Sequence, residues 1–213
     1  MESKGWNWNE VKNEWWKIPA DEVIPLSIRW EKLNKKRVLD LGCGIGRHSE
    51  LFAEKNFDVL AFDISPEGIE NITKLINEKK LKIETKIGDM QALPYDDNRF
   101  NSILAFHVIY HTDKNGIRKI IKEIERVLEK EGELYITFNS INNPSYSNPK
   151  NEIIDKYTRV KTEGVEKGIP HYYVNESELR ELLINFEIIK LQHIEDICED
   201  DRSWHYFVLA RKK

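Results

Sequence analysis

The chain has little cysteine, no long apolar run and no excess of basic residues, and each of these absences excludes a class of protein. Its two cysteines, Cys43 and Cys198, are too few and too far apart for a disulfide framework or a paired-cysteine zinc motif. No apolar run approaches the roughly 20 residues that span a bilayer, and the first residues lack the apolar core of a signal peptide. We therefore expect a soluble, cytoplasmic protein that does not enter a membrane.

The charge balance argues against a large nucleic-acid surface. The 33 basic and 37 acidic residues give a net charge of -4, whereas phosphate binding usually shows as a basic excess or a basic stripe. The 213 residues, of which 40% are hydrophobic, suit one globular domain with a full core. Nucleic acid is therefore not expected as a partner, and the choice between a monomer and a homodimer stays open.

From residue 37 onward, short apolar strands alternate with amphipathic helices. Strands are expected at 37–41, 57–62, 81–87, 100–106, 133–138, 186–193 and 204–210. In the clearest helix, Ile117, Ile120 and Ile124 form part of one apolar stripe, and Gly132 is expected to end it. The alternation predicts an α/β fold: a doubly wound, seven-stranded sheet, mostly parallel, with an antiparallel C-terminal hairpin and helices on both faces.

The strongest motif lies where the first strand meets its helix. Here Asp40 precedes Gly42, Gly44 and Gly46 in the spacing G-x-G-x-G. Glycines allow a tight turn against which a ligand can lie, and the helix that follows offers unpaired N–H groups. The spacing differs from the G-x-G-x-x-G of dinucleotide-binding folds.

Acidic residues also end the next two strands. Asp63 ends the second strand, where a carboxylate can accept hydrogen bonds from both hydroxyls of a ribose. Gly88-Asp89-Met90 ends the third strand, giving an acid beside an apolar side chain that can hold an adenine ring. Together with the glycine turn, these acids indicate a nucleoside-containing ligand.

These residues resemble the class I S-adenosylmethionine-dependent methyltransferases, whose fold is Rossmann-like. The resemblance covers about residues 37–140 and is strongest to the small-molecule group near the tellurite-resistance and ubiquinone-type enzymes. It implies S-adenosyl-L-methionine as the cofactor. It assigns the methionine end to Asp40 and the glycines, the ribose to Asp63, and the adenine to Ile64, Asp89 and Met90.

The resemblance divides the single expected domain into four parts. Residues 1–36, rich in tryptophan and interrupted by Pro19 and Pro25, would form a helical lid. Residues 37–138 would form the cofactor-binding core, 139–174 an acceptor-side insertion without clean periodicity, and 175–213 a C-terminal helix and hairpin. Asn175 is expected to cap that helix, as Ser65 caps an earlier one.

The methyl acceptor is expected at the carboxyl ends of the strands, where open α/β sheets bind their ligands. The catalytic candidates there are Tyr110, His111, His171 and Tyr172. With Trp204, they are predicted to approach one cavity next to the transferable methyl, under a cover that includes Trp15 or Trp16. His107 is expected to line the cofactor, mainly through its backbone. The order of the histidines matches no standard ligand spacing, so no metal is expected.

The predicted reaction is transfer of the methyl group to an N, O or S atom of a small molecule by in-line displacement. A base is needed only if the acceptor arrives protonated, and His111 or His171 would then serve. Two alternatives stay open: methylation of RNA or protein, and a non-catalytic cofactor-binding protein.

Overall fold

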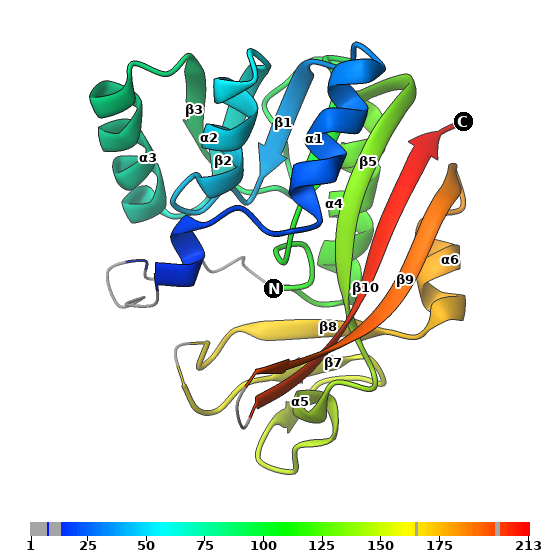
Figure 1. Cartoon of the computed structure of the whole chain (residues 1–213). Helices are drawn as coiled ribbons and strands as arrows, with labels where there is room; N and C mark the ends of the chain where they lie inside the picture. The colour runs from blue at the N-terminus through cyan, green and yellow to red at the C-terminus, as the bar shows by residue number, and fades with distance from the viewer. Residues whose placement is uncertain (1–7, 9–13, 165, 199–200) are drawn as a thin grey trace.

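The structure, a computed structural model, describes residue 8 and residues 14–164, 166–198 and 201–213 (Figure 1). Its centre is a seven-stranded sheet in the order β3-β2-β1-β4-β5-β10-β9. The strands are β1 (Arg37–Leu41), β2 (Asp58–Asp63), β3 (Ile83–Ile87), β4 (Phe100–Ala105), β5 (Leu128–Ser140), β9 (Phe186–Cys198) and β10 (Asp201–Lys212). The first five pair in parallel, and β10 is antiparallel to both of its neighbours. This confirms the predicted fold class.

Helices cover both faces of the sheet, as predicted (Figure 1). On one face lie α1 (Val23–Lys32), α2 (Arg47–Glu54) and α3 (Pro66–Lys79); on the other lie α4 (Lys114–Val127) and α6 (Glu176–Leu182). The isoleucine stripe of α4 is buried against the sheet and forms much of the larger core. No helix in the described part of the chain is long and apolar enough to cross a membrane.

The helix caps follow the sequence signals except at the end of α4. The Ser65 hydroxyl accepts a hydrogen bond from the Gly68 N–H at 3.2 Å, and the Asn175 side chain accepts one from the Glu178 N–H at 2.9 Å. The prediction that Gly132 ends α4 is wrong, because the helix stops at Val127. Leu128 is already extended and pairs with β4, so the apolar stripe runs straight into β5.

The sequence suggested that Pro19 and Pro25 both interrupt helical turns, but Pro25 does not. Pro25 lies within the first turn of α1, where backbone N–H groups have no intrahelical acceptor and proline is tolerated. Later in α1, Trp30 is fully buried and stacks on Phe52 with ring centroids 5.5 Å apart. Its indole N–H donates to Glu133 at 3.1 Å. Trp30 therefore anchors α1 to the sheet rather than serving as part of a lid.

The acceptor-side insertion has more regular structure than its sequence indicates. It contains α5 (Pro144–Ser147), β6 (Glu152–Ile153), β7 (Thr158–Val160) and β8 (Pro170–Val174). Strand β8 pairs in parallel with the end of β5 and antiparallel with β7. The insertion lies beyond the carboxyl ends of the parallel strands, beside the extended ends of β9 and β10 (Figure 1). Strands of two to five residues are too short to show a period.

Candidate active site

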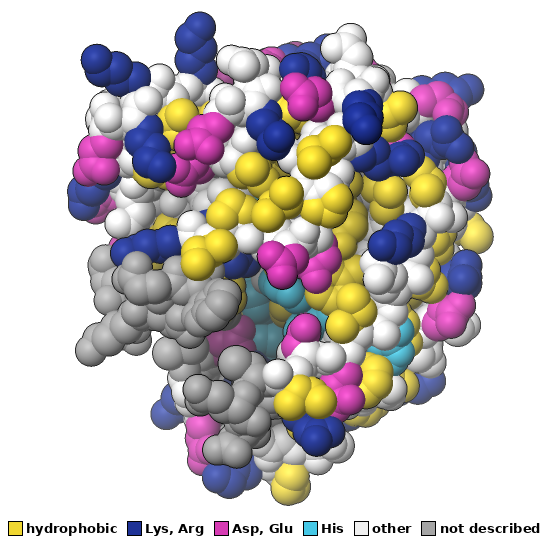
Figure 2. Space-filling view, in the orientation of Figure 1, with side chains coloured by type: hydrophobic (Ala, Val, Ile, Leu, Met, Phe, Trp, Pro, Cys, Tyr) yellow, Lys and Arg dark blue, Asp and Glu magenta, His cyan; other side chains and the backbone are white. Residues whose placement is uncertain are grey.

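A cavity of about 880 Å³ lies where the carboxyl ends of the parallel strands face the insertion. Its walls come from the turns after β1, β2, β3 and β4, the end of β5, the insertion and β10. Figure 2 shows the hollow on the molecular surface, with histidine side chains visible in it. The volume lies in the upper part of the range of small-molecule sites, about 300–1,000 Å³.

The glycine turn after β1 forms one wall and requires glycine for two separate reasons. Gly42, Gly44 and Gly46 all have positive φ angles, of 74°, 54° and 91°. A Cβ atom on Gly42 would also lie 2.2 Å from the Val108 side chain. Gly42 and Gly44 line the cavity, whereas Gly46 packs towards Ile72 of α3 and stands behind the wall.

Asp63 joins this turn to the end of β2. Its Oδ2 accepts the Gly44 N–H and its Oδ1 accepts the Ser65 N–H, each at 2.8 Å. Burial raises the pKa of Asp63, although these N–H groups oppose the shift. The carboxylate lines the cavity, and each oxygen can accept a further hydrogen bond. This is the geometry that a ribose with two hydroxyls needs.

The other two predicted acids are not among the residues that line the cavity. Asp40 is 2% exposed, and its Oδ2 accepts the Ser49 hydroxyl at 2.6 Å. Burial raises the pKa of Asp40 to about 6. Asp89 accepts the Gln91 N–H at 2.8 Å and so shapes its own turn. Of the predicted adenine-site residues, Ile64 and Met90 line the cavity and Asp89 does not.

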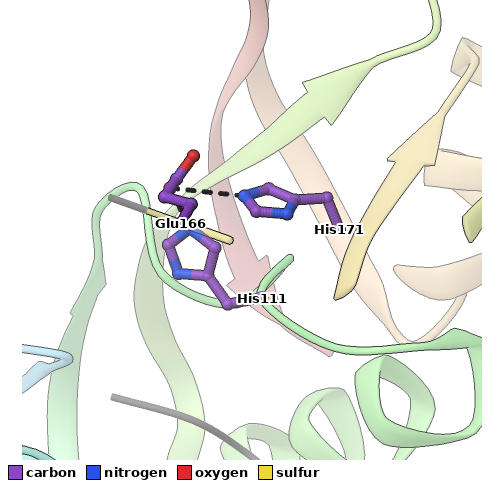
Figure 3. Close-up of side chains that lie close together, drawn as sticks. All are labelled: His111, Glu166 and His171. Carbon is purple, nitrogen blue, oxygen red and sulfur yellow. Dashed lines mark ion pairs between the residues drawn. The ribbon is translucent and has the colours of Figure 1, made fainter. Parts of the chain in front are cut away.

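The same cavity carries a polar cluster formed by His111, Glu166 and His171 (Figure 3). The imidazole rings of His111 and His171 have centroids 4.9 Å apart, and the ring of Tyr110 lies 4.8 Å from that of His111. The Glu166 Oε1 atom lies 3.2 Å from His111 Nε2 and 3.3 Å from His171 Nε2. The structure thus brings together three of the four predicted catalytic residues.

Glu166 is the residue that sequence reasoning missed. It belongs to a charged loop in which nothing distinguishes it from Glu163, whose side chain is 70% exposed. Burial would raise the pKa of Glu166, but the nearby His111 and His171 imidazoles hold that pKa well below its usual range. Burial lowers the pKa of His111, with Glu166 opposing.

Two further histidines, His107 and His205, line the same cavity. The His107 N–H donates to Thr137 Oγ1 at 2.6 Å, and the His107 and His205 rings have centroids 4.4 Å apart. Burial lowers the pKa of His107 well below its usual value and that of His205 to about 4. The contact of the His107 backbone with the cofactor stays a prediction.

Two predicted acceptor-site residues lie elsewhere, so this part of the prediction is wrong. Tyr172 is fully buried on the opposite side of β8 from His171, and its hydroxyl donates to Glu178 at 2.6 Å. Trp204 packs 4.8 Å from the His193 ring, on the opposite side of β10 from His205. Successive side chains of a strand point to opposite faces, and both segments are strands where loops or strand ends were expected.

Tryptophans from the N-terminal segment cover the cofactor end of the cavity. Trp8 and Trp16 both line it, with ring centroids 6.0 Å apart. Trp8 packs so closely on the glycine turn that a Cβ atom on Gly44 would lie 2.4 Å from its ring. Trp16 stacks on the Arg47 guanidinium at 5.1 Å. Trp16 thus has the covering position that was predicted; the side chain of Trp15 lies outside the described residues.

Sequence comparison finds a family and several relatives that match part of the chain. A family described as a methyltransferase domain matches residues 38–132. The ubiquinone biosynthesis O-methyltransferase of Pelagibacter ubique is 28% identical over 148 residues, which are 60% of each chain. The protein MJ0638 of Methanocaldococcus jannaschii is 32% identical over 122 residues, 55% of this chain and 49% of that one. The chain therefore spans about half to 60% of the length of these curated relatives.

Solved structures share the fold over most of the chain. An S-adenosylmethionine-dependent methyltransferase from Methanosarcina mazei has a TM-score of 0.73 and 23% identity, covering 85% of this chain and 96% of its own. The 1,6-didemethyltoxoflavin-N1-methyltransferase of Burkholderia thailandensis, with its substrate and S-adenosylhomocysteine bound, has a TM-score of 0.65 and 20% identity, covering 91% and 79%. With its G-x-G-x-G turn and Asp63, the matched segment is a methyltransferase domain, and the chain has the fold of the class I S-adenosylmethionine-dependent methyltransferases.

Proposed function

We propose that the protein transfers the methyl group of S-adenosylmethionine to an N, O or S atom of a small molecule held in the cavity. The observation that carries this proposal is the extent of that cavity. Its lining includes the glycine turn and Asp63 as well as Tyr110, His111 and His171. One space therefore offers both a nucleoside-binding wall and a polar wall for an acceptor.

The residues around the glycine turn fit the cofactor. The methionine part would lie beside Gly42, Gly44 and the Trp8 ring that packs on Gly44, with Asp40 close behind the turn to favour its ammonium group. Asp63 would accept the ribose hydroxyls, and Ile64 and Met90 would hold the adenine. Asp89 would support this end by shaping its turn, and His107 would line the cofactor near its reactive sulfur.

Bound S-adenosylmethionine supplies a methyl group on a positively charged sulfur. The acceptor's lone pair forms a bond to the methyl carbon while the carbon–sulfur bond breaks, and that electron pair stays on sulfur in S-adenosylhomocysteine. The chain holds acceptor and cofactor in line and excludes water. His111 and His171 orient the acceptor atom, Tyr110 packs beside them, and any proton released leaves towards this polar wall.

Three observations support a small acceptor over RNA or protein. The polar wall lies inside a cavity rather than on an open face. On the face shown in Figure 2, lysine and arginine side chains are intermixed with aspartate and glutamate, so its described part carries no basic stripe for a polyanion. The Burkholderia neighbour binds a small molecule in the same fold. The polar cluster also favours an enzyme over a passive cofactor-binding protein, which has no use for it.

The test is a transfer assay with S-adenosylmethionine that carries a deuterated methyl group. The full chain is incubated with fractionated metabolite extract, and mass spectrometry follows the label. We expect one low-molecular-weight compound to gain one labelled methyl group, with Asp58→Asn active and Asp63→Ala inactive. Label that appears only in RNA or protein would contradict the small acceptor, and absence of transfer despite tight cofactor binding would contradict the enzyme.

A further inference from the structure

His111, Glu166 and His171 direct three donor atoms to one region of the cavity wall (Figure 3). The two imidazole Nε2 atoms and a Glu166 carboxylate oxygen all lie within 4.8 Å of one another. Zinc–nitrogen and zinc–oxygen bonds are about 2.0–2.1 Å long, so two ligands of a tetrahedral ion lie about 3.3–3.4 Å apart. The Glu166 Oε1 atom is 3.2 and 3.3 Å from the two nitrogens, close to the edge of such a tetrahedron.

The orientation of His171 is that of a metal ligand. Its Nδ1 atom lies 3.0 Å from the carbonyl oxygen of Ile169, and a carbonyl can only accept a hydrogen bond. In the neutral ring, the proton is therefore on Nδ1 and the Nε2 lone pair faces the Glu166 oxygen. Metal-binding histidines are commonly fixed by a hydrogen bond from their second nitrogen in this way. His171 is 1% exposed, and its Nε2 atom forms no well-aligned hydrogen bond with the described residues.

Two facing lone pairs, one on an imidazole and one on a carboxylate, repel each other unless a cation lies between them. The second Glu166 oxygen, Oε2, is already bound by the Lys161 ammonium. Lys161 thus turns Oε1 towards the two imidazoles. The insertion brings this arrangement about: Glu166 and Lys161 come from its charged loop, and His171 comes from β8, whereas His111 follows β4.

We propose that His111, Glu166 and His171 bind a divalent transition-metal ion, with Zn²⁺ as the occupant. Two imidazoles and one carboxylate suit zinc, whereas Mg²⁺ and Ca²⁺ prefer all-oxygen sites. Three protein ligands leave a coordination position open, and all three residues line the cavity, so that position faces the acceptor. Under the proposed function, the ion would hold the acceptor's oxygen or nitrogen atom and favour its deprotonated form.

The test uses the metal ion alone, so that its outcome does not depend on methyl transfer. The full chain is stripped with a chelator and titrated with Zn²⁺ by calorimetry, and with Co²⁺ while its visible absorption is followed. We expect one equivalent of Zn²⁺ to bind and Co²⁺ to give the spectrum of a low-coordinate site. His171→Ala and Glu166→Gln should each weaken binding by at least about 10- to 100-fold. His193→Ala, which removes an exposed histidine of β9, should bind as the native chain does.

Circular dichroism and the melting temperature establish that each variant is folded. Glu166→Gln keeps the size of the side chain, so it remains informative if His171→Ala fails to fold. Equal binding of Zn²⁺ by the native chain, His171→Ala and Glu166→Gln would overturn the proposal, as would preference for Mg²⁺ over Zn²⁺. Binding of Zn²⁺ without any methyl transfer would leave the metal site in place and contradict only the proposed function.

Discussion

The carboxylate of Asp63 accepts a hydrogen bond at 2.8 Å from the backbone N–H of Gly44, which links the end of β2 to the turn after β1. The two strands are parallel neighbours, so their ends meet at one edge of the sheet. Under the proposed function, the link would position the carboxylate that accepts the ribose hydroxyls relative to the turn beside the methionine part. One side chain would then both shape the site and bind in it.

Replacing Asp63 with asparagine should weaken S-adenosylmethionine binding by about 1.5–3 kcal/mol, or roughly 10- to 100-fold, because charge-assisted hydrogen bonds to the ribose are lost. Calorimetric titration with S-adenosylhomocysteine measures the effect. Asp58→Asn provides the matched control, because this exposed residue begins the same strand at the edge away from the cavity. Equal affinities of the two variants would contradict the assignment of Asp63 to the ribose.

Gly42→Ala should destabilise the protein more than Gly164→Ala. Both glycines have a positive φ angle, 74° and 77°, which costs an alanine about 1–2 kcal/mol. Only at Gly42 would the new Cβ also meet a side chain, 2.2 Å away, whereas Gly164 has open space within 4 Å. Overpacking adds about 1–3 kcal/mol. Chemical denaturation of both variants measures the difference in their free energies of unfolding. Similar losses of stability would show that the turn shifts to accommodate the new Cβ beside Val108.

The stability of the cofactor-free protein should fall as pH rises from about 4 to about 6 because of Asp40. Its folded-state pKa is raised from 3.8 to about 6 by burial, so within this window the folded state holds a proton that the unfolded state has lost. Above this window, folding buries the charge at a cost of about 3 kcal/mol. Denaturation at several pH values should show this fall in the native chain and a smaller one in Asp40→Asn. If the stability of both proteins changed with pH in the same way, the pH dependence would come from groups other than Asp40.

Tyr110→Phe should lower activity, whereas Tyr172→Phe should lower stability. Tyr110 lines the cavity, and its hydroxyl lies 3.2 Å from His107 Nδ1, so its loss should lower kcat/KM about tenfold with little change in stability. The Tyr172 hydroxyl satisfies buried Glu178, so its loss should cost about 1–3 kcal/mol of stability and leave kcat/KM unchanged. Turnover and thermal melting of the two variants form the comparison. A reversed pattern would return Tyr172 to the acceptor site.

Trp16→Ala should raise the KM for S-adenosylmethionine about three- to tenfold, because the side chain that covers the cavity and stacks on Arg47 is removed. Trp204→Ala removes a tryptophan that does not line the cavity and should leave this KM unchanged. Steady-state kinetics at saturating acceptor distinguishes the two variants. An unchanged KM in Trp16→Ala would mean that the covering segment does not contribute to cofactor binding.

Sequence patterns located the cofactor end because its requirements are local. The glycine turn needs positive φ angles within five residues, and Asp63 marks the end of a strand whose apolar run is plain. The helical spacing of the isoleucines in α4 likewise predicts which face of the helix is buried. Each of these features can be found without knowing what else folds against it.

The acceptor end was predicted only in part, because its geometry depends on contacts between distant segments. Glu166 acquires its role from His111 and His171, and its neighbour Glu163, with the same chemistry, faces solvent. In the run His171-Tyr172-Tyr173, the alternation that turns Tyr172 away from the cavity exists only because β8 pairs with β5 and β7. No local signal in so short a strand reveals that pairing.

The pairing of β8 with β5 also bears on how this chain could be re-engineered. Asn139 pairs with Tyr173 and Ser140 with Val174, so the backbone leaves the sheet and rejoins it at adjacent positions. The sheet itself therefore holds the two ends of the intervening segment together. Under the proposed function, replacing this segment with one of different length would change which acceptor is methylated. Asp63 and the glycine turn, on the other side of β4, would keep their places.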